Sequence, residues 1–107
     1  MNNVRRKKIS KLIRELELLN NNYSQERLSK SIDTLEDIKN EEEEAFDNMP
    51  EGLQYSSRGM DSEAAINNLD EALSYLEEAC EMDDADEREI NIEMAIDCLE
   101  YAACKNL

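Results

Sequence analysis

Apolar residues recur along the first half of the chain at spacings of three and four, the period of an amphipathic helix. The first series is Ile9, Leu12, Ile13, Leu16 and Leu19, and the second is Leu28, Ile32, Leu35, Ile38, Ala45, Phe46 and Met49. Three asparagines at residues 20–22 predict the end of the first helix, and Ser24 predicts the N-cap of the second. The second series has a gap at Glu42. Its helix is expected to stop near Asn48, because Pro50 disfavours helical geometry in the residues before it.

Two further helices are predicted beyond residue 60. Their apolar series are Ile66, Leu69, Leu73, Leu76 and Cys80 in the third helix, and Ile92, Ala95, Ile96, Leu99, Ala102 and Ala103 in the fourth. Asp61 or Ser62 would cap the third helix. A short polar connection that contains Asp83, Asp84 and Asp86 would separate it from the fourth. Because this connection is so short, we expect the two helices to be antiparallel neighbours.

Residues 49–59, MPEGLQYSSRG, hold the only proline and both glycines of the chain. Proline removes a backbone donor and glycine admits conformations that other residues avoid, so the segment should interrupt the helices. We therefore expect a single helical domain over residues 1–107. It divides into a first helical hairpin (1–49), a connecting segment (50–60) and an acidic second hairpin (61–107).

The connecting segment carries side chains that could serve either packing or binding. Tyr55 and Arg58 are of the types favoured in protein contacts, so they are candidates for a partner-binding loop. Alternatively the segment is held against the bundle, with Leu53 and Met60 in the apolar interface. We expect Leu53 and Met60 to pack in this way, and we retain Tyr55 and Arg58 as candidate contact residues.

The composition favours packed helices over a sheet. Valine occurs once, at Val4, and aromatic residues make up 5% of the chain, whereas pleated surfaces prefer β-branched and aromatic side chains. The predicted fold is all-α, with four helices arranged as two antiparallel helical hairpins. These form either a compact bundle or a coiled-coil-like bundle completed by a second chain. We expect a homodimer, because narrow aliphatic seams on small helices are often buried between subunits.

Acidic residues outnumber basic residues by 27 to 12, which gives a formal net charge of -15. Six of the basic residues lie within residues 1–14, which contain no acid. The rest of the chain should therefore repel nucleic acid and anionic membranes and attract basic proteins. The basic start could bind nucleic acid or a membrane surface, or it could lie against acidic helices of the same or a partner chain. We expect the second arrangement, and predict no direct nucleic-acid or membrane partner.

The chain has three cysteines (Cys80, Cys98 and Cys104), no histidine and no secretory signal after its basic start. A reduced, cytoplasmic protein is expected, with the cysteines packed as small core residues, because a metal site would need a fourth ligand. The acid-rich stretches lack the glycine and glutamate positions of an EF-hand, and the His-containing pairs of di-iron bundles are impossible. We therefore predict no catalytic residue, metal or cofactor, and no enzyme activity.

The stretch NMPEGLQYSSRGMDSEAAINNLDEALSYLEEA, residues 48–79, resembles a group of small acidic proteins encoded by bacteriophages of Gram-positive bacteria. In that group a Pro-Glu-Xaa-Leu-Gln segment and a following Arg-Gly precede an acidic helix rich in Asn-Leu-Asp-Glu-Ala. The group has no defined catalytic or binding motif, so the resemblance assigns no role to any residue. It implies a phage genome, and hence a small protein that acts on a system in the cytoplasm of a bacterial host.

The acids of the second hairpin lie off its apolar series. The predicted partner-binding acids are Asp70, Glu71, Glu77, Glu78, Glu81, Glu89, Glu93, Asp97 and Glu100. Neighbours on one helix face stand about 5–6 Å apart, which is comparable with the spacing of successive phosphates along a nucleic-acid strand. Rows of such carboxylates could therefore imitate the DNA backbone in the basic groove of a target protein. The alternative is a solvated face that keeps the bundle in solution.

These observations predict a non-enzymatic, phage-type inhibitor that binds the basic surface of a host nucleic-acid-binding defence protein. An anti-CRISPR or anti-restriction role would fit, with the acidic helices acting as a DNA mimic. The alternative class is a structural or adaptor protein whose helices oligomerise or join a phage assembly.

Overall fold

The computed structural model describes residues 1–103, and within them every regular element is a helix. The elements are α1 (Asn3–Asn21), α2 (Gln25–Asp47), α3 (Glu51–Gln54), α4 (Ser57–Glu81) and α5 (Ala85–Ala103). Four of them are long, and α3 is a single turn.

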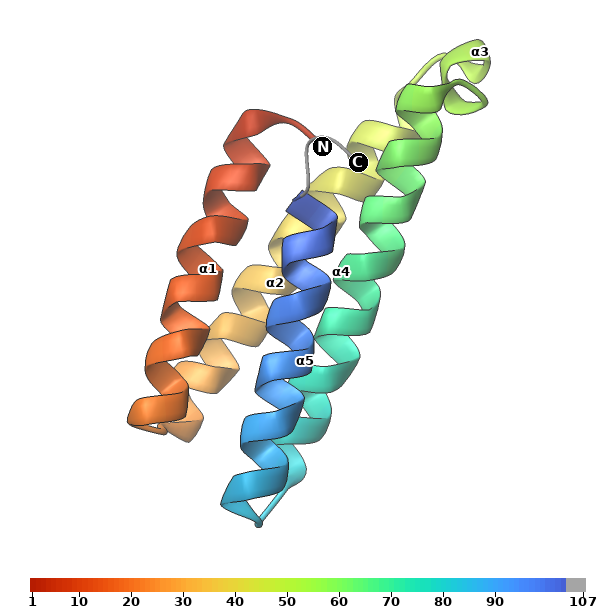
Figure 1. The fold of residues 1–107 in the computed structure, drawn as a ribbon. Helices are drawn as coiled ribbons and strands as arrows, with labels where there is room; N and C mark the ends of the chain where they lie inside the picture. The colour runs from red at the N-terminus through yellow and green to blue at the C-terminus, as the bar shows by residue number, and fades with distance from the viewer. Residues whose placement is uncertain (104–107) are drawn as a thin grey trace.

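The four long helices lie side by side and alternate in direction (Figure 1). α2 packs against α1 and α4, and α5 packs against α4 and α1, so the helices close a ring around one core. The bundle measures 47 × 22 × 20 Å. The predicted all-α fold of two antiparallel hairpins is thus confirmed, in the form of a compact bundle that a single chain completes.

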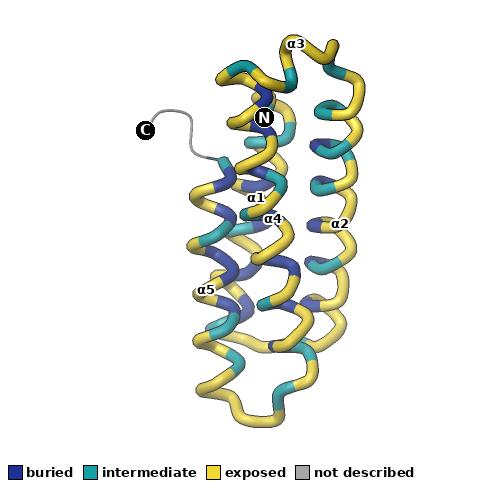
Figure 2. Tube along the Cα trace, turned by 90° about the vertical axis from the view of Figure 1, so that its right-hand side faces the viewer, coloured by how far each residue is buried: buried dark blue, intermediate teal, exposed yellow. Residues whose placement is uncertain are grey.

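The core is aliphatic and is built mainly from the predicted apolar series. Its buried members are Ile9, Leu12, Leu16, Leu19, Leu28, Leu35, Ile38, Leu69, Ala72, Leu73, Leu76, Ala79, Ile92, Ala95, Ile96, Leu99 and Ala102. Figure 2 shows buried positions on the inner side of each long helix and exposed positions outside. Ile66 and Cys80, which were predicted for the seam of the third helix, are only half-buried. Burying one such aliphatic side chain contributes about 1.5–3 kcal/mol, so packing stabilises helices whose local propensity alone would not.

Local signals set most of the helix ends. The predicted ends of the first two helices are confirmed, α1 within the asparagine run and α2 at Asp47. Ser24 is the N-cap of α2, and its side chain accepts a hydrogen bond from the Arg27 N–H at 3.4 Å. At the start of α5, Asp84 Oδ1 accepts from the backbone N–H of Asp86 at 2.8 Å. These side chains satisfy donors that the first helical turn leaves free.

The predicted start of the third helix is wrong. α4 begins at Ser57, whereas the sequence predicted a cap at Asp61 or Ser62. Gly59 lies buried in the first turn of α4, where a Cβ atom would overlap the carbonyl group of Gln54. The glycine therefore does not break the helix. It permits close contact between α4 and the backbone of the preceding turn.

α3 projects from one end of the bundle (Figure 1). The Gln54 side-chain amide donates to the Phe46 carbonyl at 3.1 Å and ties the turn to the end of α2. Leu53 remains 42% exposed and Met60 64% exposed. The prediction that these two residues pack into the apolar interface is wrong, because the segment turns outward at the end of the bundle and does not cover its core.

Candidate protein-interaction surface

All nine acidic side chains predicted as a partner-binding surface are exposed. They are Asp70, Glu71, Glu77, Glu78 and Glu81 on α4, and Glu89, Glu93, Asp97 and Glu100 on α5. Residues 57–103, which span both helices and their connection, hold fifteen acidic residues and only two basic ones, Arg58 and Arg88. This half of the bundle therefore presents a strongly negative surface.

Arg88 forms no ion pair with an acid of the described residues, and its guanidinium is held by other contacts. The guanidinium carbon lies 3.9 Å from the centroid of the Tyr23 ring, in cation–π geometry. One of its nitrogens also donates to the Met82 carbonyl at 3.2 Å. Arg88 thus joins the α1–α2 connection to the α4–α5 connection.

The acids of α4 divide between its two neighbouring helices. Asp70 faces α2, where its Oδ1 atom accepts from Lys39 Nζ at 2.9 Å. Glu71 is turned toward α5, with Oε2 3.7 Å from Cys98 Sγ, and Glu78 follows one heptad later, 3.5 Å from an amide hydrogen-bond donor of Asn91. Successive helical residues differ by about 100° in direction, which separates Asp70 from Glu71. The acids of α4 therefore form more than one row.

The acids of α5 form one continuous row. Asp86, Glu89, Glu93, Asp97 and Glu100 follow one another at spacings of three, four, four and three. All five are exposed, and none forms an ion pair with another residue of the described chain. At about 1.5 Å per residue the row is about 21 Å long, with neighbours about 5–6 Å apart. The prediction that Asp86 lies in the connection between the last two helices is wrong, because Asp86 lies in the first turn of α5 and begins this row.

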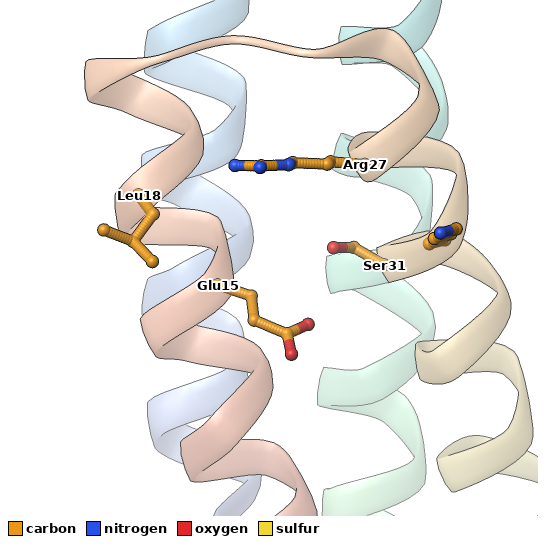
Figure 3. A pocket seen from close by; sticks show the side chains of 5 residues that line it. Glu15, Leu18, Arg27 and Ser31 are labelled. Atoms are coloured by element: carbon orange, nitrogen blue, oxygen red, sulfur yellow. The ribbon is translucent and has the colours of Figure 1, made fainter.

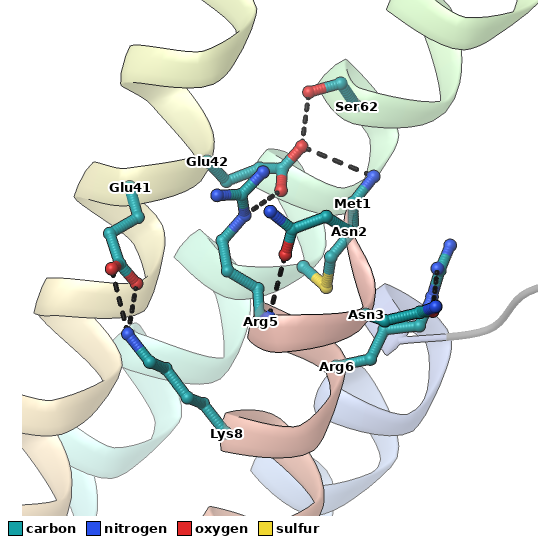
Figure 4. Close-up of polar contacts among 9 residues, drawn as sticks. All are labelled: Met1, Asn2, Asn3, Arg5, Arg6, Lys8, Glu41, Glu42 and Ser62. Carbon is teal, nitrogen blue, oxygen red and sulfur yellow. Dashed lines mark hydrogen bonds and ion pairs between the residues drawn. The ribbon is translucent and has the colours of Figure 1, made fainter.

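The basic start of the chain lies against acids of the same chain, as predicted, although the partner helix is α2. Arg5 Nε lies 2.8 Å from Glu42 Oε1, and Lys8 Nζ lies 2.9 Å from Glu41 Oε1 (Figure 4). These pairs attach the first turns of α1 to the last turns of α2. They leave the acids of α4 and α5 to face outward.

Glu42 occupies the gap in the apolar series of the second predicted helix. Its side chain is completely buried, and Oε2 accepts a hydrogen bond of 2.5 Å from Ser62 Oγ. The amino group of Met1 lies 3.5 Å from the same oxygen, and Arg5 holds the other one (Figure 4). One carboxylate therefore joins α1, α2 and α4.

Opposing effects act on the pKa of Glu42. Burial raises it, but the hydrogen bonds from Ser62 and Arg5 and the charge of the Met1 amino group outweigh burial, so the pKa lies below its ordinary value. Glu42 is thus an ionised structural group. An acid at an apolar position of a helical series was the signal that could have revealed it, since a buried carboxylate requires partners.

The candidate loop residues do not join the acidic row. Tyr55 is 78% exposed, and Arg58 is exposed in the first turn of α4. Both belong to the end of the bundle from which α3 projects, beyond the last described turn of α5 (Figures 1 and 2). A partner would reach them together with the α5 acids only by extending past that end.

Two cysteines pack partly against the core, and no disulfide joins them within residues 1–103. Cys80 and Cys98 are free and half-buried, while Cys104 lies outside the described residues. Burial and the neighbouring charge of Glu71 raise the pKa of the Cys98 thiol. A raised pKa keeps a thiol protonated and unreactive.

One hollow of the surface lies between α1 and α2. Its volume is about 270 Å³, and it is lined by Glu15, Leu18, Arg27, Lys30 and Ser31 (Figure 3). Within residues 1–103 no group of three or more Cys, Asp or Glu side chains is arranged to hold a metal ion. No helix of this part of the chain is long and apolar enough to span a membrane.

Comparison of the chain with protein-family models, with curated proteins and with solved structures gives no match.

Proposed function

We propose that this protein is a non-enzymatic inhibitor that binds the basic surface of a host nucleic-acid-binding protein through the acids of α4 and α5. The observation that carries the proposal is the α5 row, Asp86, Glu89, Glu93, Asp97 and Glu100, which is exposed and has no ion-pair partner in the described chain. The resemblance of residues 48–79 to phage proteins adds the context of an anti-CRISPR or anti-restriction factor.

The physical basis is electrostatic imitation of a nucleic-acid strand. A groove that binds DNA places lysine and arginine side chains to meet a regular line of negative charge. A helix holds carboxylates at a comparable spacing without the conformational entropy of a flexible chain, so less ordering opposes binding. The surrounding negative field also accelerates encounter with a cationic surface.

Affinity capture from a bacterial lysate tests this function. The immobilised protein should retain nucleic-acid-binding proteins at low salt and release them as the salt is raised, because the contacts are ionic. Added duplex DNA should compete for the retained proteins. Retention of proteins without basic surfaces, or retention that neither salt nor DNA reduces, would contradict the proposal.

Two matched variants identify the acids that matter. The α5 charge variant carries Glu89→Gln, Glu93→Gln, Asp97→Asn and Glu100→Gln. The control charge variant carries Glu17→Gln, Asp33→Asn, Glu44→Gln and Asp47→Asn, which change exposed acids of α1 and α2. Both variants remove four negative charges, so a loss of capture that is confined to the α5 charge variant assigns binding to the α5 row and not to net charge.

A structural or adaptor role is the second candidate, and exposed apolar side chains such as Tyr101, at 65%, favour it. The homodimer that the sequence predicts is compatible with both candidate functions. The aliphatic seams that suggested a dimer meet one another inside a single chain, so a second chain is not required to bury them. Light scattering separates the roles, because a large closed oligomer would favour assembly, whereas a monomer or dimer fits inhibition.

A further inference from the structure

A stripe of exposed apolar side chains runs along α5 beside its acidic row. Ile90, Met94 and Tyr101 are 57%, 41% and 65% exposed, and they are spaced by four and seven residues. Cys98, half-buried, lies on the same side between Met94 and Tyr101. We call these four residues the apolar stripe. Large apolar side chains gathered on one face characterise interaction surfaces more than single exposed residues do.

Acids border the apolar stripe on both sides. On the α4 side, the contacts of Glu71 with Cys98 and of Glu78 with Asn91 bring two carboxylates to the boundary between the helices. On the other side, the helical rotation of about 100° per residue places Glu93 and Glu100 away from Cys98. The face therefore consists of an apolar centre between two negative edges.

The chain itself contains a helix with the chemistry that matches such a face. α1 buries its apolar residues and pairs its cations with acids of the adjacent helix, Arg5 with Glu42 and Lys8 with Glu41. It is a basic amphipathic helix packed on acidic helices. The outer face of α4 and α5 offers the same two elements, apolar contact and flanking carboxylates, to a helix from another protein.

We propose that the α4–α5 face docks a basic amphipathic α-helix of the target, with the partner's apolar side chains on the apolar stripe and its lysines or arginines against the acidic edges. This inference rests on the proposed function and specifies the partner: the basic surface of the target includes an amphipathic helix. Charge complementarity selects this occupant, because an acidic or neutral helix would leave the flanking carboxylates without partners.

Binding of model peptides to the full chain tests the inference. The probe is a Leu/Lys peptide of about 21 residues, with leucine at heptad positions a and d and lysine elsewhere. A peptide with glutamine in place of leucine keeps the charge and removes the apolar face. The stripe variant carries Ile90→Gln, Met94→Gln and Tyr101→Gln, and its control carries Val4→Gln, Leu18→Gln and Leu53→Gln, whose exposures of 62%, 61% and 42% are similar.

The stripe variant should bind the Leu/Lys peptide at least about tenfold more weakly than wild type, which corresponds to about 1.4 kcal/mol, and the control variant should bind it unchanged. The Gln/Lys peptide should bind all three proteins equally and weakly. Equal affinity of the stripe and control variants for the Leu/Lys peptide would overturn the inference. Light scattering could also overturn it. If wild type is a dimer and only the stripe variant is a monomer, the apolar stripe faces a second copy of this chain and not a target helix.

Capture from lysate distinguishes failure of this inference from failure of the proposed function. If the stripe variant captures the same basic proteins as wild type while the α5 charge variant does not, the helix-docking inference is wrong and the acidic inhibitor remains. If neither variant alters capture, both are wrong. Loss of capture in both variants, with the two control variants unchanged, supports both.

Discussion

Ser62 Oγ donates a hydrogen bond of 2.5 Å to Glu42 Oε2, across the contact between α4 and α2. Both residues are completely buried, and Arg5 completes the link to α1. Because a buried carboxylate is stable only with its partners, this cluster fixes how the two hairpins meet at one end of the bundle.

Glu42→Ala should destabilise the protein by about 3–5 kcal/mol, because it leaves Arg5 without its buried partner. Ser62→Ala should cost about 1.5–3 kcal/mol, the range for a hydrogen bond to a charged group. Urea unfolding measures both values. The adjacent Glu41→Ala is the matched control, since its pair with Lys8 is half-exposed and contributes about 0–1 kcal/mol. Similar losses for Glu41→Ala and Glu42→Ala would contradict the structural role of Glu42.

The stabilisation by Glu42 should depend on pH. Its pKa in the folded protein lies below the ordinary value of 4.5, so the stabilising contribution is present above that value and is lost as the pH falls through the folded pKa. The difference in free energy of unfolding between wild type and Glu42→Gln should therefore be constant near neutral pH. It should shrink as the pH falls below about 4.5. A difference that grows in acid would show that burial dominates and that the pKa is raised.

The two glycines should respond in opposite ways to alanine. At Gly59 a Cβ atom would overlap the backbone of Gln54 and Leu53, so Gly59→Ala should cost about 1–3 kcal/mol. At Gly52 nothing lies within 4 Å of the added atom, and Gly52→Ala should be neutral or stabilise by about 0.4–1 kcal/mol. Thermal unfolding of the two variants checks the pair. Equal changes in thermal stability for the two variants would contradict the close contact between Gly59 of α4 and the backbone of Gln54.

Cys98 should become more reactive when Glu71 loses its charge. Burial is the first cause of the raised thiol pKa, and the charge of Glu71 and its hydrogen bond from Cys98 Sγ are the next. In a Cys80→Ser, Cys104→Ser background, Glu71→Gln should lower that pKa and speed alkylation of Cys98 by iodoacetamide near pH 8. Glu78→Gln serves as the control, and an equal acceleration by both changes would show a general effect of net charge.

Local sequence signals predicted the elements of this fold well. The spacing of Leu69, Leu73 and Leu76 predicted a buried seam, and the Ser24 cap predicted the start of α2. These features depend on residues within one or two helical turns, so they can be read before the tertiary structure is known. Four such apolar series, joined by short connections, then restrict the fold to a few arrangements of antiparallel helices.

The features that local sequence patterns did not predict depend on how separate segments of the chain pack together. The close approach of Gly59 to the Gln54 backbone and the 42% exposure of Leu53 depend on how the short helix α3 is placed at the end of the bundle. The pairing of Glu42 with Ser62 and Arg5 needs three helices to be in place. The exposure of the acids could be predicted from one helix, but the division of the α4 acids between α2 and α5 could not.

The salt dependence of target binding by wild type, the α5 charge variant and the control charge variant tests the central claim most directly. For a target recovered by affinity capture, log K should fall linearly with log salt concentration for wild type. The α5 charge variant should bind at least about tenfold more weakly at low salt and show a shallower slope, whereas the control charge variant should stay close to wild type. Equal affinities and equal slopes for the two variants would contradict the role of the α5 row.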